Sequence, residues 1–405
     1  MVTTTYVGTY QPAYYAIVGL PTRFLPPRHG VYAARLVSVA MVAALAASAL
    51  TSARKLGSTV TGATLLTFTP ALVFVASTVN AQGPELVAAI AVWTTGLVVL
   101  GSNPPTRREV IRLGVAASVL ASSRPTGPLL TMIILVVLGL AAANLARLRM
   151  LWSHRSTRVV AAVTALVWAA SVIHVIATSA LTSVMITPRP EGLTRAHWNE
   201  VAATVPQLVE DQVALISWHG IVALNLVKPL LVAWFALLAS LVVVALVRGT
   251  WRSRLIMVAM VTGWITLPLA AVLINHEAAW QGRYGLPLGV GIPILAAWTI
   301  ERRPAQGRWA PTRPAFTVVA ATAVATGLVV AHQQLMSRNL HGQPSPVFAP
   351  RSPDLWNGPL NPDLLFLGMI LAAIIIIGLT LLQVVPLRRA PHPSGHGVTA
   401  QELRG

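Results

Sequence analysis

Two arginines and one lysine lie near the ends of apolar segments, in parts of the chain where positive charge is otherwise sparse. Arg124 is in the stretch SSRPTGPL, Arg283 is in QGRYGLPL, and Lys228 begins a long apolar run. A planar guanidinium matches the oxygens of a phosphate, and a lipid-borne phosphate is the natural anion at a membrane surface. We therefore predict that these side chains converge on a lipid phosphate or on the sugar attached to it. The alternative is that each one only extends to the headgroup region.

The densest polar group of the sequence surrounds Arg283. It consists of His276, Glu277, Gln281, Arg283 and Tyr284 within the stretch HEAAWQGRYGLPL. We predict that this group binds a ligand, with Glu277 as a weak candidate for a catalytic carboxylate. Glu277 could instead only neutralise Arg283.

A tight turn, STVNAQGPEL, contains the other candidate carboxylate. Asn80 lies in this turn, Gly83 and Pro84 form it, and Glu85 falls in the first turn of the next helix. An acid in that position suits the helix dipole, which explains Glu85 without any function. The functional interpretation is that Asn80 and Glu85 line a polar cavity at the membrane surface.

Other polar residues favour a structural explanation. His174 falls in the middle of an apolar segment, where a lone histidine is typically buried and hydrogen-bonded. A solvated helix face explains most of His197, Glu200, Glu210 and Asp211.

Composition indicates a membrane protein. The chain has 405 residues, of which 55% are hydrophobic and only 10% charged, and its mean hydropathy is +0.69. A span needs roughly 20 apolar residues, with about 17 tolerable. This predicts an all-α polytopic membrane protein of about eleven spans, at 31–53, 59–79, 84–101, 108–122, 127–147, 159–182, 222–248, 254–275, 284–300, 314–332 and 363–385.

Positive charge is clustered in every second gap between these spans. Arg54 with Lys55, Arg107 with Arg108, and later arginine groups alternate with gaps that hold most of the acids. By the positive-inside rule, the arginine-rich gaps are cytoplasmic. We therefore predict a multi-pass protein of the plasma (inner) membrane, with its N-terminal segment outside and its C-terminus in the cytoplasm. The net charge of +18 is located at helix ends, which argues against nucleic-acid binding and predicts membrane lipids as partners.

The predicted organisation has three parts. Residues 1–30 form a segment at the outer interface, with a short helix within Tyr10 to Leu25. Residues 31–385 form a single transmembrane domain whose large outer loops are 187–221, with one or two surface helices, and the irregular 333–362. Residues 386–405 form a disordered tail.

Soluble-enzyme motifs are absent from the sequence. It lacks a phosphate-binding loop of the ATPase type, a serine-hydrolase elbow, a zinc-protease helix and cysteine. ATP-driven pumping and zinc proteolysis are therefore not indicated.

Five stretches resemble the bacterial membrane family named domain of unknown function 2142. They occur in the expected order over about two thirds of the chain, at Tyr10–Pro21, Tyr32–Ser38, Phe74–Glu85, Ser122–Leu129 and Gln281–Leu288. That family resembles the GT-C class of membrane glycosyltransferases, which take a sugar from a polyprenyl-phosphate donor on the outer face. The resemblance implies a cell-envelope glycosyltransferase with such a donor, transferring a hexosyl or pentosyl group.

The chain departs from the family pattern in two places. Members usually begin with a further span and an outer loop of the form Asp-Glu-Pro-x-His, and we expect both to be missing here. Many members also carry a Trp-Leu-Asp-Thr stretch where this chain has Trp218, His219 and Gly220. The family resemblance implies a base, or a divalent metal held by an outer-loop carboxylate, but the sequence identifies no metal site.

Three hypotheses follow from these features. The first is the glycosyltransferase, with its base absent or supplied by Glu85 or Glu277. The second is a truncated or inactive relative that acts as a scaffold subunit. The third is a lipid or solute transporter, for which His174 would be the central ionisable residue.

Overall fold

The fold is entirely helical in the residues that the structure describes. The computed structural model describes residues 6–101, 104–180, 194–214, 227–274, 282–302, 312–341 and 360–384. Eight helical segments there are long and apolar enough to cross a membrane, and the number rises to ten if two bent pairs each count as one span. The predicted all-α polytopic membrane fold is confirmed, while the predicted count of about eleven is approximate.

The eight segments include seven continuous helices: α2 (Pro27–Leu56), α5 (Gln82–Leu100), α9 (Arg155–Ala177), α12 (Val227–Arg248), α13 (Trp251–Ile274), α16 (Thr312–His341) and α17 (Pro362–Val384). The eighth is built from three short pieces, η3 (Gly282–Gly285), α14 (Leu286–Gly289) and α15 (Gly291–Glu301).

Two predicted spans are bent. Helix α3 (Ser58–Leu66) meets α4 (Pro70–Ala76) at 71°, and α7 (Gly127–Ala142) meets α8 (Leu145–Ser153) at 118°. At the first bend, the Thr69 hydroxyl caps α4 by accepting a hydrogen bond from the Leu72 amide at 3.2 Å. The remaining predicted span, 108–122, corresponds to α6 (Arg107–Ser123), which has 17 residues. That helix is about 25 Å long, somewhat shorter than a typical hydrocarbon core.

Helix α5 is the centre of the bundle. It packs against α2, α6, α7, α4, α14 and α15, and 89% of its apolar window is buried. The indole of Trp93, which is fully buried, donates a hydrogen bond to the Pro287 carbonyl at 3.0 Å. A Cβ atom on Gly291 would lie 2.4 Å from the Trp93 ring, so only glycine allows α15 to approach α5 this closely.

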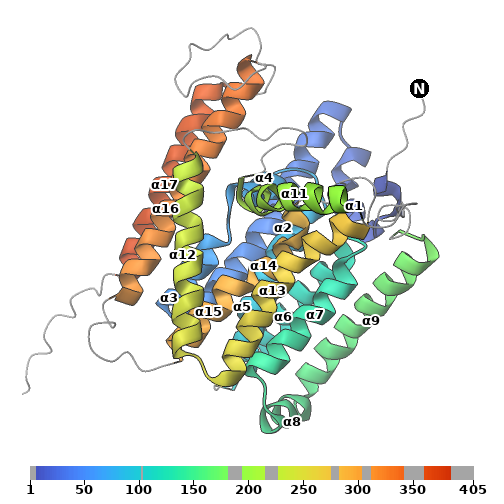
Figure 1. Ribbon diagram of the computed structural model, residues 1–405. Helices are drawn as coiled ribbons and strands as arrows, with labels where there is room; N and C mark the ends of the chain where they lie inside the picture. Colours follow the sequence, from blue (N-terminus) through green and yellow to red (C-terminus); the bar gives the residue numbers. More distant parts are fainter. Residues whose placement is uncertain are drawn as a thin grey trace, which may run out of the picture.

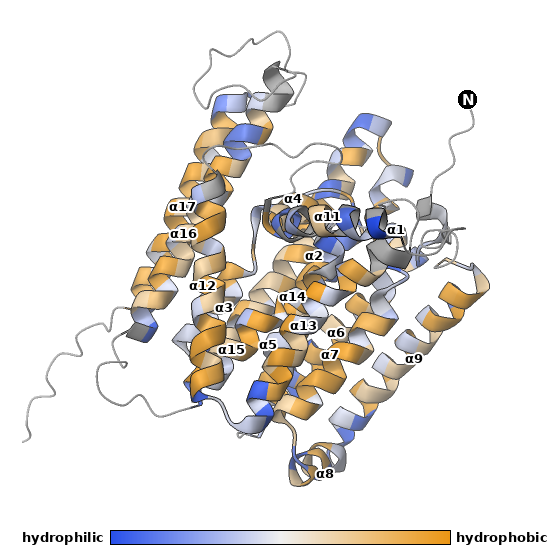
Figure 2. Cartoon of the chain, in the orientation of Figure 1, coloured by the Kyte–Doolittle hydropathy of each residue, from blue (hydrophilic) through white to orange (hydrophobic). Residues whose placement is uncertain are grey.

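The peripheral helices present apolar side chains outward. In α9, Leu166 is 71% exposed and Ile176 is 72% exposed, and in α17 Leu382 is 70% exposed. Figure 2 shows both helices as predominantly hydrophobic along their length. Such surfaces are expected where lipid, and not water, surrounds the protein.

Short helices gather at one end of the bundle. Figure 1 shows α11 (Arg195–Ala214) running across the ends of the long helices, where it contacts α4, while α1 (Pro12–Val18) packs against α2 and α6. In the described part of the predicted outer loop 187–221, a surface helix is present, and it contains Pro206. In the N-terminal segment, the predicted helix between Tyr10 and Leu25 is divided into α1 and η2 (Leu20–Arg23), after η1 (Tyr6–Thr9).

Helix α16 extends further than predicted. It ends at His341, so the first part of the predicted irregular loop 333–362 is helical. Residues 342–359 and the tail 386–405 lie outside the described residues.

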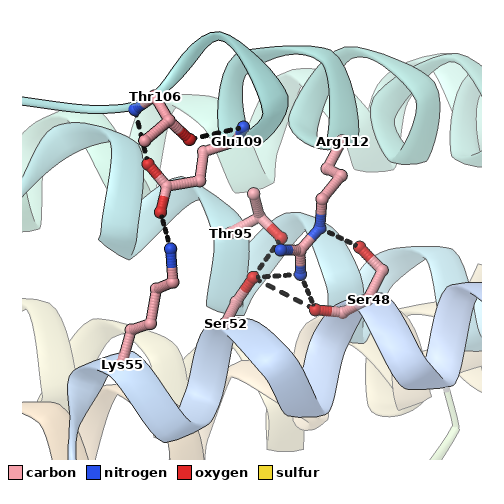
Figure 3. A network of polar contacts seen from close by, with 7 residues as sticks. All are labelled: Ser48, Ser52, Lys55, Thr95, Thr106, Glu109 and Arg112. Atoms are coloured by element: carbon pink, nitrogen blue, oxygen red, sulfur yellow. Dashed lines mark hydrogen bonds and ion pairs between the residues drawn. The ribbon is translucent and has the colours of Figure 1, made fainter.

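The opposite end of the bundle carries most of the arginines, and we call it the arginine-rich end. Here Lys55 at the end of α2 pairs with Glu109 near the start of α6 (Figure 3). Arg313 of α16 pairs with Glu301 at the end of α15, with 2.7 Å between Nη1 and Oε2. Glu109 also forms a capping box with Thr106, whose amide donates to Oε2 at 2.7 Å.

One arginine is held among small polar side chains within the helical bundle. Arg112 of α6 donates hydrogen bonds from its guanidinium to the hydroxyls of Ser48 and Ser52, both at 2.8 Å (Figure 3). Ser52 in turn is 2.9 Å from the Thr95 hydroxyl. These contacts join α2, α5 and α6, and they satisfy a charge that would be costly in lipid.

Candidate functional site

The candidate site is at the end of the bundle opposite the arginine-rich end. It comprises Tyr10, Glu85, Arg124, Asp211, Arg283 and Tyr284, and we call it the two-arginine site. Its residues come from the N-terminal segment, α5, the α6–α7 turn, α11 and η3.

Glu85 and Arg124 form a buried ion pair. Glu85 is 1% exposed, and its Oε2 lies 3.4 Å from Nη1 of Arg124. Its Oε1 accepts a hydrogen bond from the Thr126 hydroxyl at 3.3 Å. Burial lowers the pKa of Arg124, but the Glu85 carboxylate, together with Tyr10 and Tyr284, raises that pKa above its ordinary value. Arg124 is therefore a permanent cation at this position.

The α6–α7 turn fixes the position of Arg124. Arg124 has an extended backbone after the last residue of α6, and its carbonyl accepts a hydrogen bond from the Gly127 amide at 2.8 Å. A Cβ atom on Gly127 would lie 2.3 Å from the Leu120 carbonyl oxygen. The glycine of the SSRPTGPL stretch thus allows the turn to fold against α6.

Two tyrosines cover the Arg124 guanidinium. Its Cζ lies 4.7 Å from the centre of the Tyr284 ring and 5.7 Å from that of Tyr10. Cation–π contacts at such distances contribute about 0.5–2 kcal/mol, more where water is excluded. Tyr10 is placed by α1, which is attached to α2 through a 2.9 Å hydrogen bond between the hydroxyls of Tyr14 and Ser38.

Arg283 is next to this pair. It is 4% exposed, and its side chain is hydrogen-bonded to that of Tyr284. Its backbone carbonyl accepts a hydrogen bond from the Gln82 side chain at 3.4 Å, which links η3 to the first turn of α5. Tyr284 thus contacts both arginines of the site.

Asp211 brings a second carboxylate to the site from α11. The end of α11 is anchored through Gln212, whose carbonyl accepts from the Thr69 hydroxyl at 3.1 Å and whose Oε1 accepts from the Trp264 indole at 2.5 Å. Helix α11 packs against η3, and Asp211 is half-buried. Burial raises the pKa of Asp211 to about 6; the charge of Glu210 acts in the same direction, and that of Arg283 acts against both.

The structure brings together four of the nine predicted site residues: Glu85, Arg124, Arg283 and Tyr284. Asn80 lies in the turn before α5, where its Oδ1 accepts a hydrogen bond from the Gln82 amide at 2.9 Å, so the described contact is a turn contact. Lys228 lies in the first turn of α12, but its side chain is outside the described part. His276, Glu277 and Gln281 lie outside the described residues.

Sequence reasoning missed Asp211 and Tyr10 as members of this site. The sequence assigns Asp211 to a solvated helix face, because the sequence of a polar loop does not show whether an acid points to solvent or to the protein. The available signal in the sequence was the apolar stretch that follows it, which begins at Val213, a residue that the structure buries. Tyr10 belongs to an aromatic stretch, but its contact with Arg124 joins residues far apart in sequence.

The sequence places His174 in the middle of an apolar segment, but in the structure it is not at the centre of its helix. It lies in the last turn of α9, and its Nε2 is 3.2 Å from the Tyr10 carbonyl oxygen. Its described contact therefore tethers the segment that carries Tyr10. The transporter hypothesis, which relied on a central histidine, loses its main support.

Over the described ranges, no three histidine or acidic side chains come together in a way that could hold a metal ion.

A family model for predicted membrane proteins, DUF2142, matches residues 2–292. The chain belongs to the DUF2142 family. The matched residues include every member of the two-arginine site, so the site lies within the part of this DUF2142 protein that defines the family. No curated protein and no solved structure matches the chain.

Proposed function

We propose that this DUF2142 protein is a GT-C-type glycosyltransferase of the cell envelope, using a polyprenyl-phosphate-linked sugar at the outer face of the plasma membrane. The observation that carries the proposal is the convergence of Arg124, Arg283 and Asp211 at one end of an apolar helical bundle. Positive charge at that depth suits a lipid phosphate, and a nearby carboxylate suits proton transfer from a hydroxyl group.

The two arginines have different roles in this proposal. Arg124 has Glu85 as a fixed counter-ion and two tyrosine rings over its guanidinium, so it is a rigid part of the site. Arg283 interacts electrostatically with both Arg124 and Asp211, and in this proposal it binds the donor phosphate directly. The second positive charge, that of Arg124, strengthens the attraction for the same phosphate.

Asp211 is the proposed general base. The acceptor hydroxyl oxygen forms a bond to the anomeric carbon of the sugar, and the bond between that carbon and the phosphate oxygen breaks. The hydroxyl proton moves to Asp211, and the lipid phosphate leaves with the electron pair. Protonation removes the negative charge of Asp211 at the moment when charge grows on the phosphate beside Arg283. A pKa of about 6 keeps most Asp211 side chains ready to accept a proton at neutral pH.

Glu85 is a candidate general base from its sequence position, but in this proposal it is not the base. Both of its oxygens are engaged by Arg124 and Thr126, and it is 1% exposed. An acceptor hydroxyl would have no free oxygen to approach. Glu85 is instead a positioning residue that keeps Arg124 charged and in place.

The test uses the purified protein in nanodiscs with undecaprenyl-phosphate-linked, radiolabelled hexoses and pentoses. Release of undecaprenyl phosphate, by transfer or by hydrolysis, should occur with at least one donor. Arg283→Ala should raise the donor KM at least tenfold, while Arg158→Ala, an exposed arginine of α9 at the arginine-rich end, should change nothing.

The outcomes separate the hypotheses. Donor binding that depends on Arg283 without any release would indicate an inactive relative with an intact donor site. Neither binding nor release with any donor would contradict the proposal.

A further inference from the structure

A second polar site lies at the arginine-rich end of the bundle. A cavity of about 490 Å³ opens there between the ends of α2, α5, α6 and α15. Its charged lining consists of Lys55, Glu109, Glu301 and Arg302, and its apolar wall includes Leu97 and Trp298. It is at the opposite end of the bundle from the two-arginine site, and the proposed transfer reaction does not use it.

Each oxygen of the two carboxylates in this cavity already accepts a hydrogen bond. For Glu109, Oε1 accepts from Lys55 and Oε2 accepts from the Thr106 amide at 2.7 Å (Figure 3). For Glu301, Oε1 accepts from the Thr59 amide and Oε2 from Arg313, both at 2.7 Å. Both acids are therefore already paired with a cation of the protein, Lys55 or Arg313.

The cationic groups are more open. Lys55 has a side chain that is 49% exposed although it contacts Glu109. The guanidinium of Arg302 lies over the Trp298 ring, with Cζ 4.7 Å from its centre. A stacked guanidinium keeps its edge N–H groups directed outward, which is the geometry that a phosphate requires. With Arg313, which pairs with Glu301, the cavity and its surroundings contain three cationic side chains and two carboxylates.

We propose that this cavity binds a phosphate-bearing anion between Lys55 and Arg302, and we call it the second anion site. Basic pockets between membrane helices recognise anionic headgroups, because a fixed positive charge there meets a phosphate at its own depth. The same chemistry would also hold the phosphate of a soluble phosphoester. The inference is independent of the glycosyltransferase proposal, since no residue is shared with the two-arginine site.

The experiment compares two probes. The protein is placed in phosphatidylcholine nanodiscs, with or without one fifth phosphatidylglycerol, and the lipids retained after mild release are counted by native mass spectrometry. In parallel, binding of radiolabelled inorganic phosphate is measured in the pure phosphatidylcholine discs. Retention of phosphatidylglycerol alone identifies a lipid headgroup as the ligand, and saturable phosphate binding identifies a soluble one.

Variants decide whether the cavity is responsible. Arg302→Gln should reduce the retained anion at least fivefold, while Arg158→Gln, with the same charge change on exposed α9, should have no effect. Glu109→Gln removes the partner of Lys55 and should increase binding, which a merely misfolded variant would not do. If Arg302→Gln matches Arg158→Gln for both probes, or Glu109→Gln lowers binding, the proposal is wrong.

Discussion

Arg124 and Glu85 are 39 positions apart in sequence, yet their side chains form an ion pair with 3.4 Å between Nη1 and Oε2. Arg124 follows α6 and Glu85 lies in the first turn of α5, so the pair joins two neighbouring helices at the end where the proposed chemistry occurs. Both side chains are largely shielded, with exposures of 12% and 1%.

Removing either partner of this pair should destabilise the protein. Glu85→Gln and Arg124→Gln should each lower the melting temperature in detergent, because either leaves an uncompensated buried charge, a loss of about 3–5 kcal/mol. The double variant should recover much of the loss. A double variant as unstable as the sum of the single variants would show that the two side chains act independently.

The contact between Trp93 and Gly291 predicts a second difference in stability. Gly291→Ala should destabilise the protein by about 1–3 kcal/mol, because the new methyl group would overlap the indole ring. The matched control is Gly139→Ala in α7, where nothing lies within 4 Å of the new Cβ. That change should be neutral or stabilising by up to about 1 kcal/mol. Equal melting temperatures for the two variants would contradict the close packing of α5 on α15.

The orientation in the membrane can be tested directly because the chain contains no cysteine. Thr22→Cys, in the N-terminal segment, should react with a membrane-impermeant maleimide in intact cells. Ser153→Cys, which is exposed in α8 at the arginine-rich end, should react only after lysis. Labelling in the reverse pattern would place the two-arginine site in the cytoplasm and exclude an outer-face donor.

Much of this architecture was accessible from the sequence. Each predicted span corresponds to a helix, a bent pair or, at 284–300, a run of three short helical pieces, because a lipid environment requires long apolar runs that are easy to recognise. The bends at α3–α4 and α7–α8 were not predicted, since hydropathy does not report helix direction.

The candidate site was only partly predictable. Arg124, Arg283, Tyr284 and Glu85 were recognised because charge is conspicuous in apolar surroundings. Asp211 and Tyr10 were not, because their roles depend on how α11 and α1 fold over the bundle, which is a tertiary relationship. The Arg112 contacts were missed for the same reason, since serines of α2 satisfy that charge.

The raised pKa of Asp211 predicts a pH-dependent contribution to stability. Its carboxyl has an ordinary pKa of 3.8 and a folded-state pKa of about 6, so folding favours the protonated form. The stabilising contribution is complete below about pH 4 and is lost as the pH rises through about 6. As the pH rises from about 4 to about 6, the melting temperature of Asp211→Asn should therefore rise relative to that of the wild type. Above that window, the difference between the two melting temperatures should stay constant. Glu210→Gln, which removes a charge that raises the pKa of Asp211, should move the wild-type transition to lower pH and not abolish it.

The most direct test of the central claim is the pH–rate profile for release of undecaprenyl phosphate by wild type, Asp211→Asn and Glu210→Gln. The account predicts a wild-type rate that rises through about pH 6, as Asp211 loses its proton, and then levels off. Asp211→Asn should reduce kcat at least a hundredfold with donor binding preserved, and Glu210→Gln should retain activity. If Asp211→Asn turns over at the wild-type rate with an unchanged profile, Asp211 is not the base and the assigned mechanism is wrong.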